Sequence, residues 1–198
     1  MAAVPFIGLT GGMGAGKSVA LEILERLGAV TLSTDAAVHE IYEDPEVVAL
    51  VTDRWGPDVA PGGVVDRSAI AKAAFADPDE RAWLEQQIWP RVAQRVLAFR
   101  EEANTMDPPP RAAIVETPLL FEAGMDAAYD ATIAVVADED VRAERAAARG
   151  HAALDERAAR QLPQEEKARR ATFAVQNSGT LDALEEVLSE VLAKLERS

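Results

Sequence analysis

A glycine-rich stretch near the N-terminus places a lysine and a hydroxyl where phosphate chemistry needs them. Residues 8–18 read GLTGGMGAGKS, and the part from Gly11 to Ser18 fits the pattern G-x-x-x-x-G-K-[S/T]. Glycine lets backbone N–H groups approach phosphate oxygens and adopts the positive φ angles that such a nest needs. We expect Lys17 to reach the β- and γ-phosphates of a nucleotide and Ser18 to ligate Mg²⁺. The stretch predicts a nucleoside triphosphate site rather than a flexible turn.

An acidic side chain follows the next apolar segment. Asp35 ends the sequence TLSTD, which places it at the carboxyl edge of the expected parallel sheet, where open α/β sheets bind their ligands. There it would orient or accept the proton of an attacking hydroxyl. Aspartate is also a common helix N-cap. Position alone favours neither role.

The elements that must position these residues follow from the apolar pattern. Buried strands are expected at residues 4–11, 29–32, 112–116, 131–137 and 174–177. Helices are expected at residues 18–27, on both sides of Pro45, from Pro78 to about residue 105 with a bend at Pro90, at 138–150, around Pro163 and at 181–195. Residues 57–68 form a turn-rich excursion, read as a small hairpin or a loop.

The order of these elements indicates the fold class. A strand, a glycine loop, a helix and a second strand predict parallel pairing with a right-handed crossover. We predict a three-layer α/β fold of the P-loop NTPase type, in which helices flank a parallel sheet of about five strands. The last helix is expected to pack on the sheet through Leu181, Leu184, Leu188, Val191 and Leu195.

Composition narrows the class of function. The chain has 198 residues, a formal net charge of −14, 48% hydrophobic residues and no cysteine. These values fit one domain, residues 1–198, that is cytoplasmic and has neither a signal peptide nor a membrane span. Nucleic acid is disfavoured as the main partner because little positive charge is available to displace counterions.

Several motifs along the chain resemble the dephospho-CoA kinase family. They are LTGGMGAGKS, STD, residues 56–85, ETPLLFEAG and NSG, in this order over essentially the whole chain. The resemblance implies transfer of the γ-phosphoryl group of ATP to the ribose 3′-hydroxyl of dephospho-CoA, with Mg²⁺, which is the final step of coenzyme A biosynthesis. It implies ATP and dephospho-CoA as partners, neither nucleic acid nor membrane, and a monomer or weak homo-oligomer.

The resemblance also implies roles for individual residues. Asp35 would be the catalytic carboxylate, with Lys17 and Arg145 stabilising charge, and Asp35, Glu116 and Leu119 would contact the acceptor. The residues implied to bind ATP are Gly12, Gly14, Ala15, Gly16, Lys17, Ser18, Val19, Arg149 and Asn177. Residues 44–107 would form a helical acceptor subdomain and residues 138–172 a lid-like region.

Five positions depart from the family pattern. They are Val19 in place of threonine, Ser33 and Glu116 in place of aspartates, Trp89 in place of histidine, and Thr172 in place of aspartate. The lysine, serine and aspartate on which the predicted reaction depends are all retained.

Alternatives remain for several side chains. Arg142, Arg145 and Arg149 are spaced by three and four, so they fit a cationic lid or a solvated helix face. Glu116 fits an acceptor contact, a group near the metal, or a buried carboxylate with a structural partner. Lys167, with its basic neighbours, is read as a surface or lid residue. The three tryptophans are read as packing residues, and His39 as half-buried.

Two other functions compete with this interpretation. Another small-molecule kinase, acting on a nucleoside or a sugar acid, would share the phosphate loop and Asp35. A regulatory module would hold ATP without transferring phosphate to an acceptor. A panel of acceptors would distinguish another small-molecule kinase from a dephospho-CoA kinase. ADP release that depends on an acceptor would distinguish a kinase from a regulatory module.

Overall fold

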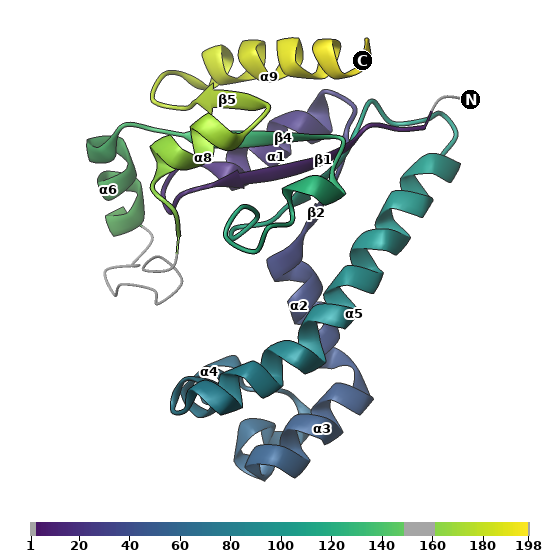
Figure 1. Ribbon diagram of the computed structural model, residues 1–198, viewed down its shortest axis with the longest axis vertical. Coiled ribbons are helices and arrows are strands. Elements are labelled where there is room, and N and C mark those ends of the chain that lie inside the picture. The colour runs from purple at the N-terminus through teal and green to yellow at the C-terminus, as the bar shows by residue number, and fades with distance from the viewer. Residues whose placement is uncertain (1–2, 149–160, 198) are drawn as a thin grey trace. The chain divides into compact units, whose positions relative to one another are not determined.

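The chain divides into two compact units. The computed structural model describes residues 3–148 and 161–197. One unit is formed by Met1–Ser33 with Phe99–Ser198, and the other by Thr34–Ala98. The elements of both units are labelled in Figure 1.

The first unit contains a five-stranded sheet, as the sequence predicts. Its strands are β1 (Phe6–Gly11), β2 (Val30–Ser33), β3 (Ala113–Glu116), β4 (Ala131–Val136) and β5 (Phe173–Gln176). They lie in the order β2-β3-β1-β4-β5, and every neighbouring pair is parallel. β1 is buried along its whole length, which is why its sequence is apolar without alternation. The chain therefore leaves β1 at the centre of the carboxyl edge, between β3 and β4.

Helices cover both faces of this sheet (Figure 1). Those of the first unit are α1 (Lys17–Arg26), α6 (Glu139–Ala148), α8 (Gln164–Arg170), α9 (Leu181–Leu195) and the C-terminal end of α5 (Pro78–Thr105). α1 and α9 share a hydrophobic core with Ile7 and Leu9 of β1. On the opposite face, α8 packs against β1 and β4, and Arg100 of α5 lies 4.8 Å from the Phe6 ring centroid. This arrangement confirms the predicted three-layer α/β fold.

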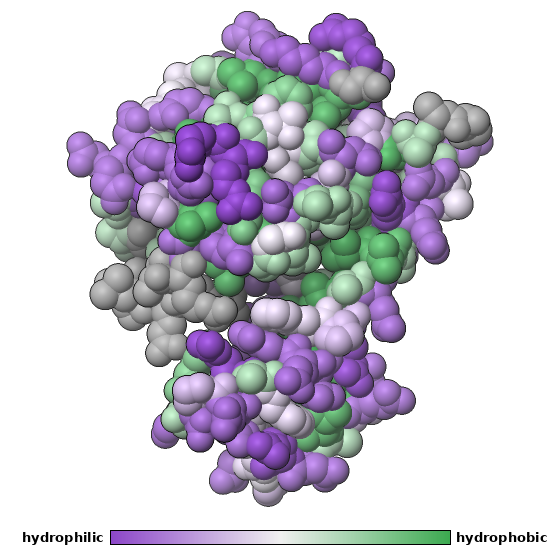
Figure 2. Space-filling view, viewed as in Figure 1, coloured by the Kyte–Doolittle hydropathy of each residue, from purple (hydrophilic) through white to green (hydrophobic). Residues whose placement is uncertain are grey.

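α9 shows the predicted division into an apolar and a polar side. Leu184, Leu188, Val191 and Leu195 are buried against the sheet. Leu181 is 63% exposed, so the prediction for this residue is wrong; it is the first residue of the helix and lies outside the core cluster. Figure 2 shows hydrophilic side chains over α9, at the top of the view.

The second unit is helical. Its elements are α2 (Thr34–Glu43), α3 (Pro45–Trp55), α4 (Arg67–Phe75) and the first part of α5. The predicted break at Pro45 is confirmed, and Asp44 caps α3 by accepting a hydrogen bond from the Glu46 N–H at 2.9 Å. The apolar core contains Val47, Val51, Val59, Ile70 and Ile88.

The turn-rich segment of this unit is a loop, one of the two forms that the sequence predicts, and a helix that was not predicted follows it. Pro57–Val59 and Pro61–Gly63 form two short 3₁₀ turns rather than a hairpin, and α4 follows them unpredicted. Asp66 caps α4 by accepting hydrogen bonds from two backbone N–H groups, at 2.8 and 3.2 Å. An aspartate immediately before an alanine-rich stretch was the available signal for this helix.

The tryptophans separate into two groups. Trp55 and Trp83 pack edge to face with ring centroids 5.1 Å apart, and Glu80 accepts a hydrogen bond from Trp55 Nε1 at 2.7 Å. Trp89 is 57% exposed, so the packing role predicted for it is wrong. Along the described residues, no helix combines the length and apolarity that a bilayer crossing needs.

Candidate active site

The glycine loop between β1 and α1 has the backbone of a phosphate cradle. Gly14 and Gly16 have φ angles of +74° and +90°, which place both in the left-handed region. The Ala15 N–H donates to the Gly12 carbonyl at 3.2 Å, and this bond closes the loop on itself. Gly16 is the N-cap of α1, so the helix begins at Lys17, and the first N–H groups of a helix favour anions.

Asn177 supports the loop from the end of β5. Its side chain is buried, and Nδ2 donates to the Ala15 carbonyl at 2.8 Å. Its backbone N–H donates to Val136 of β4 at 2.7 Å, which anchors the residue to the sheet. Asn177 was predicted to bind ATP; in the structure its side chain bonds to the backbone of the loop predicted to hold the phosphates.

Two arginines of α6 also reach this region. Arg142 Nε donates to the Met13 carbonyl at 3.0 Å, and Arg145 Nη1 donates to the Asn177 carbonyl at 2.9 Å. Both side chains are partly buried, so a fully solvated helix face describes neither of them. Arg142, which spacing alone did not favour over Arg145, lies against the loop. Arg149 lies outside the described residues.

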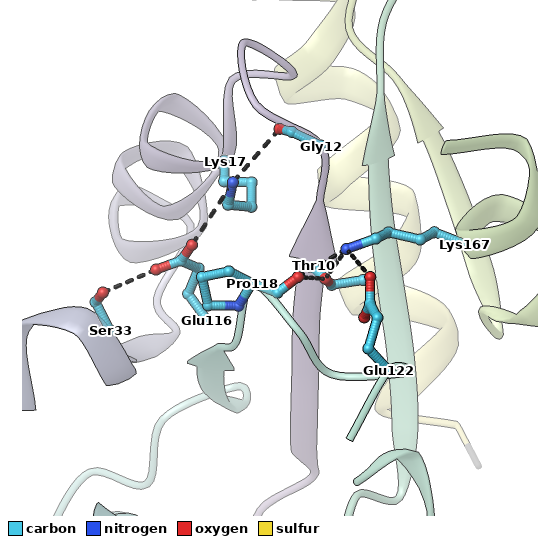
Figure 3. Close-up of polar contacts among 8 residues, drawn as sticks. All are labelled: Thr10, Gly12, Lys17, Ser33, Glu116, Pro118, Glu122 and Lys167. Carbon is cyan, nitrogen blue, oxygen red and sulfur yellow. Dashed lines mark hydrogen bonds and ion pairs between the residues drawn. The ribbon is translucent and has the colours of Figure 1, made fainter. Parts of the chain in front are cut away.

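A line of three side chains runs across the carboxyl edge of the sheet (Figure 3). Lys17 Nζ donates to the Gly12 carbonyl at 3.4 Å and lies 3.8 Å from Glu116 Oε1. Ser33 Oγ donates to Glu116 Oε2 at 2.8 Å, because Ser33 and Glu116 are register partners on β2 and β3. An aspartate at position 33 would bring a second negative charge to this carboxylate, whereas serine provides a donor.

Asp35 lies two residues beyond the end of β2. α2 begins at Thr34, so Asp35 is in the first turn of the helix and not its N-cap. The side chain is partly buried and belongs to the second unit.

Three other residues considered from the sequence are Leu119, Thr172 and His39. Leu119 is half-buried in the loop after β3. The Thr132 N–H donates to the Thr172 hydroxyl and the Thr172 N–H donates to the Thr132 hydroxyl, both at 3.0 Å. Thr172 therefore links the start of β5 to β4. His39 is exposed rather than half-buried and contacts Arg67.

Lys167 is a functional candidate that the sequence did not reveal. The prediction of a surface position is wrong, because the residue is fully buried and Nζ lies 3.0 Å from Glu122 Oε1. Burial lowers the pKa of Lys167 from its ordinary value, while the hydrogen bond and charge of Glu122 oppose that shift. α8 is polar on all sides in sequence, so periodicity could not single out one buried lysine.

Comparison with known proteins identifies the family. A family model described as dephospho-CoA kinase matches residues 5–183. The chain belongs to the dephospho-CoA kinase family. A relative from Deinococcus radiodurans named dephospho-CoA kinase is 39% identical over 193 residues, covering 96% of this chain and 92% of the relative.

Solved structures share the fold of this chain. The crystal structure of TT1252 from Thermus thermophilus superposes with a TM-score of 0.79 at 34% identity and covers 98% of both chains. A dephospho-CoA kinase from Campylobacter jejuni superposes with a TM-score of 0.67 at 20% identity over the full length of both chains, which shows the shared fold.

The family fixes the reaction class. Members of the dephospho-CoA kinase family phosphorylate dephospho-CoA with ATP in the final step of coenzyme A biosynthesis. The predictions of family, reaction and enzyme class, a kinase that transfers phosphate to an alcohol, are therefore confirmed. The roles of individual residues remain predictions.

Proposed function

We propose that Lys17, Ser18 and Asp35 carry the phosphoryl transfer in this chain. The γ-phosphoryl group of ATP passes to the ribose 3′-hydroxyl of dephospho-CoA, and ADP and coenzyme A are released. Asp35 orients the hydroxyl and takes up its proton, while Lys17 stabilises charge on the transferring oxygens. Because such transition states are loose, positioning and electrostatics contribute more than the base strength of Asp35.

The observation that carries this proposal is the position of the Lys17 ammonium group. Its ammonium lies between the Gly12 carbonyl and the Glu116 carboxylate, at the mouth of a loop with two left-handed glycines. Glu116 offsets the lysine charge before nucleotide binds. When phosphate oxygens enter, they offer charged acceptors to the same ammonium.

The residues present suit Mg²⁺ bound together with nucleotide. The Ser18 hydroxyl is exposed at the start of α1 and would be the protein ligand, with Glu116 nearby as a negative group. Among the described residues, no cluster of three or more acidic or histidine side chains would hold a metal by itself. This fits Mg²⁺, which commonly takes few protein ligands and binds through substrate phosphates and water. The ion would neutralise phosphate charge.

The nucleotide and acceptor contacts are also part of the proposal. Arg145 stabilises charge on the phosphates, and Arg149 contacts the nucleotide. Asn177 holds the loop in its binding conformation through Ala15. Glu116 and Leu119 face the acceptor, residues 44–107 bind the rest of it, and residues 138–172 act as the lid.

Acceptor-dependent ADP release tests the function directly. Purified protein is incubated with Mg·ATP alone and with dephospho-CoA, adenosine, shikimate or gluconate. We expect dephospho-CoA alone to stimulate release and coenzyme A to appear by mass spectrometry in equal amount. Stimulation by another acceptor would assign a different kinase. Tight ATP binding without stimulation by any acceptor would favour a regulatory module.

A further inference from the structure

A buried lysine joins three parts of the first unit that are distant in sequence. Lys167 on α8 is fully buried, and Nζ donates to the Pro118 carbonyl at 2.7 Å. Nζ also lies 3.0 Å from Glu122 Oε1 and 3.5 Å from Thr10 Oγ1. The three protons of the ammonium thus have three oxygen partners on β1 and on the loop after β3 (Figure 3).

The carboxylate in this cluster depends on the lysine. Glu122 Oε1 accepts from Lys167 and from the Leu162 N–H, the latter at 2.7 Å. Its second oxygen, Oε2, is buried and accepts no hydrogen bond from the part of the chain that the structure describes. Lys167 therefore provides the positive charge that compensates a carboxylate whose side chain is only 13% exposed.

Core packing alone does not explain a charged pair here. Apolar side chains of similar volume fill such a position without the desolvation cost of two ions, and replacement of buried pairs by apolar groups is often neutral or stabilising. The pair makes specific hydrogen bonds that an apolar residue cannot make. Those bonds fix the loop after β3 relative to the end of β1, and the glycine loop begins directly after β1.

The fixed segment connects two parts of the proposed site. Thr10 is the next-to-last residue of β1, directly before the glycine loop. Pro118 follows two residues after Glu116, whose carboxylate lies 3.8 Å from Lys17 Nζ. By holding Thr10 and the Pro118 carbonyl together, the ammonium sets the direction in which the chain leaves β3. It thereby sets the position of Leu119, the residue directly after Pro118.

We propose that Lys167 is a positioning residue for phosphoryl transfer. It locks the loop after β3 to the end of β1 and so aligns Glu116 and Leu119, the proposed acceptor contacts, with the phosphate loop. This role rests on the proposed function. It acts through Glu122 and Pro118, without contact between Lys167 and the reacting atoms.

Four variants test the role. Lys167→Met keeps the length of the side chain and leaves Glu122 uncompensated. Lys167→Met with Glu122→Gln removes both charges and keeps an acceptor for the Leu162 N–H. Lys167→Arg keeps a positive charge at this position. Lys194→Met is the matched control, since Lys194 is an exposed lysine on α9 that pairs with Glu190 and lies outside the proposed site.

The measurements separate positioning from stability. We expect the double variant to melt closer to wild type than Lys167→Met does, because no buried charge is left unpaired. Its kcat/KM for dephospho-CoA should fall by about 10- to 100-fold, while the Kd for ATP changes by less than about threefold. Lys167→Arg should recover most of the activity, and Lys194→Met should match wild type. Hydrogen exchange should become faster at residues 118–124 in the double variant.

Three outcomes would overturn the role. The first is that the wild-type protein is active and the double variant has the same kinetics and the same hydrogen exchange at residues 118–124. Another is a loss of activity in proportion to the unfolded fraction, with equal effects on ATP and acceptor. The third is wild-type protein that binds ATP but does not phosphorylate dephospho-CoA, which would overturn the proposed function and this role with it.

Discussion

The contact between Gly16 and Asn177 supplies a quantitative test of how the phosphate loop is built. A Cβ added at Gly16 would overlap Asn177 Nδ2, the group that donates to the Ala15 carbonyl. The φ angle of Gly16 is +90°, which is itself unfavourable for alanine. Gly16→Ala must therefore strain the backbone and also displace the Asn177 amide.

The contacts of Gly16 and Asn177 set how much each variant should lose in free energy of unfolding. Asn177→Ala removes a buried hydrogen bond and leaves a carbonyl unsatisfied, at a cost of about 1–3 kcal/mol. Gly16→Ala adds a left-handed strain to that same loss and should cost about 2–5 kcal/mol. In the double variant the amide is already absent, so the total should remain about 2–5 kcal/mol. Independent effects would instead give about 3–8 kcal/mol.

Urea denaturation followed by circular dichroism measures these values. All three tryptophans lie in residues 34–98, so their fluorescence would report the other unit. Gly124→Ala is the control: its φ is +64° and nothing lies within 4 Å of the added Cβ, so only the strain should appear. We also expect weaker ATP binding in Gly16→Ala and unchanged binding in Gly124→Ala. Additive losses in the double variant would refute the proposed steric coupling.

Three further predictions concern the site and the second unit. Asp35→Asn should lower kcat by about 100-fold or more and leave the Kd for ATP nearly unchanged, as steady-state kinetics and nucleotide titration would measure. Ser33→Ala should lower the free energy of unfolding by about 1–2 kcal/mol through loss of the bond to Glu116. Ser33→Asp should lower it further at neutral pH, where two carboxylates repel, and the gap between the variants should narrow in acid. The hydrogen bond from Arg54 lowers the pKa of Glu80 from its ordinary value of 4.5, so the resulting stabilisation is present above that value and is lost as the pH falls. Glu80→Gln should therefore make unfolding less dependent on acidic pH, as Tm measured across that range would show.

Each of these predictions has a result that contradicts it. Wild-type turnover in Asp35→Asn would remove Asp35 from the mechanism. Equal stability of Ser33→Ala and Ser33→Asp at neutral pH would show that the second charge is not felt at Glu116. An unchanged acid limb of the Tm profile in Glu80→Gln would show that Glu80 titrates alike in the folded and unfolded chain.

Local sequence determined the elements whose signal lies within a few residues. The glycine loop with Lys17 and Ser18 is one such case, because phosphate binding needs this composition at this spacing. The strands were readable because β1 and its neighbours are buried on both faces and consist mostly of apolar residues without alternation. α4 was missed because its apolar pattern is weak and its strongest signal, the Asp66 cap, adjoins a turn-rich segment.

Contacts between distant segments were decided by tertiary structure alone. Ser33 meets Glu116 because β2 and β3 pair in a register that neither strand encodes by itself. Arg142 reaches the glycine loop because of how α6 docks against it.

Lys167 shows the physical reason most clearly. In sequence it is one cation among charged neighbours, and a charged side chain in a polar helix indicates solvent. Its burial is possible because Glu122, the Pro118 carbonyl and Thr10 are brought to it by other parts of the fold. The sequence by itself determined the phosphate loop, the parallel sheet and the family. Only the tertiary structure decided which polar groups meet around Lys167, since they come from α8, β1 and the loop after β3.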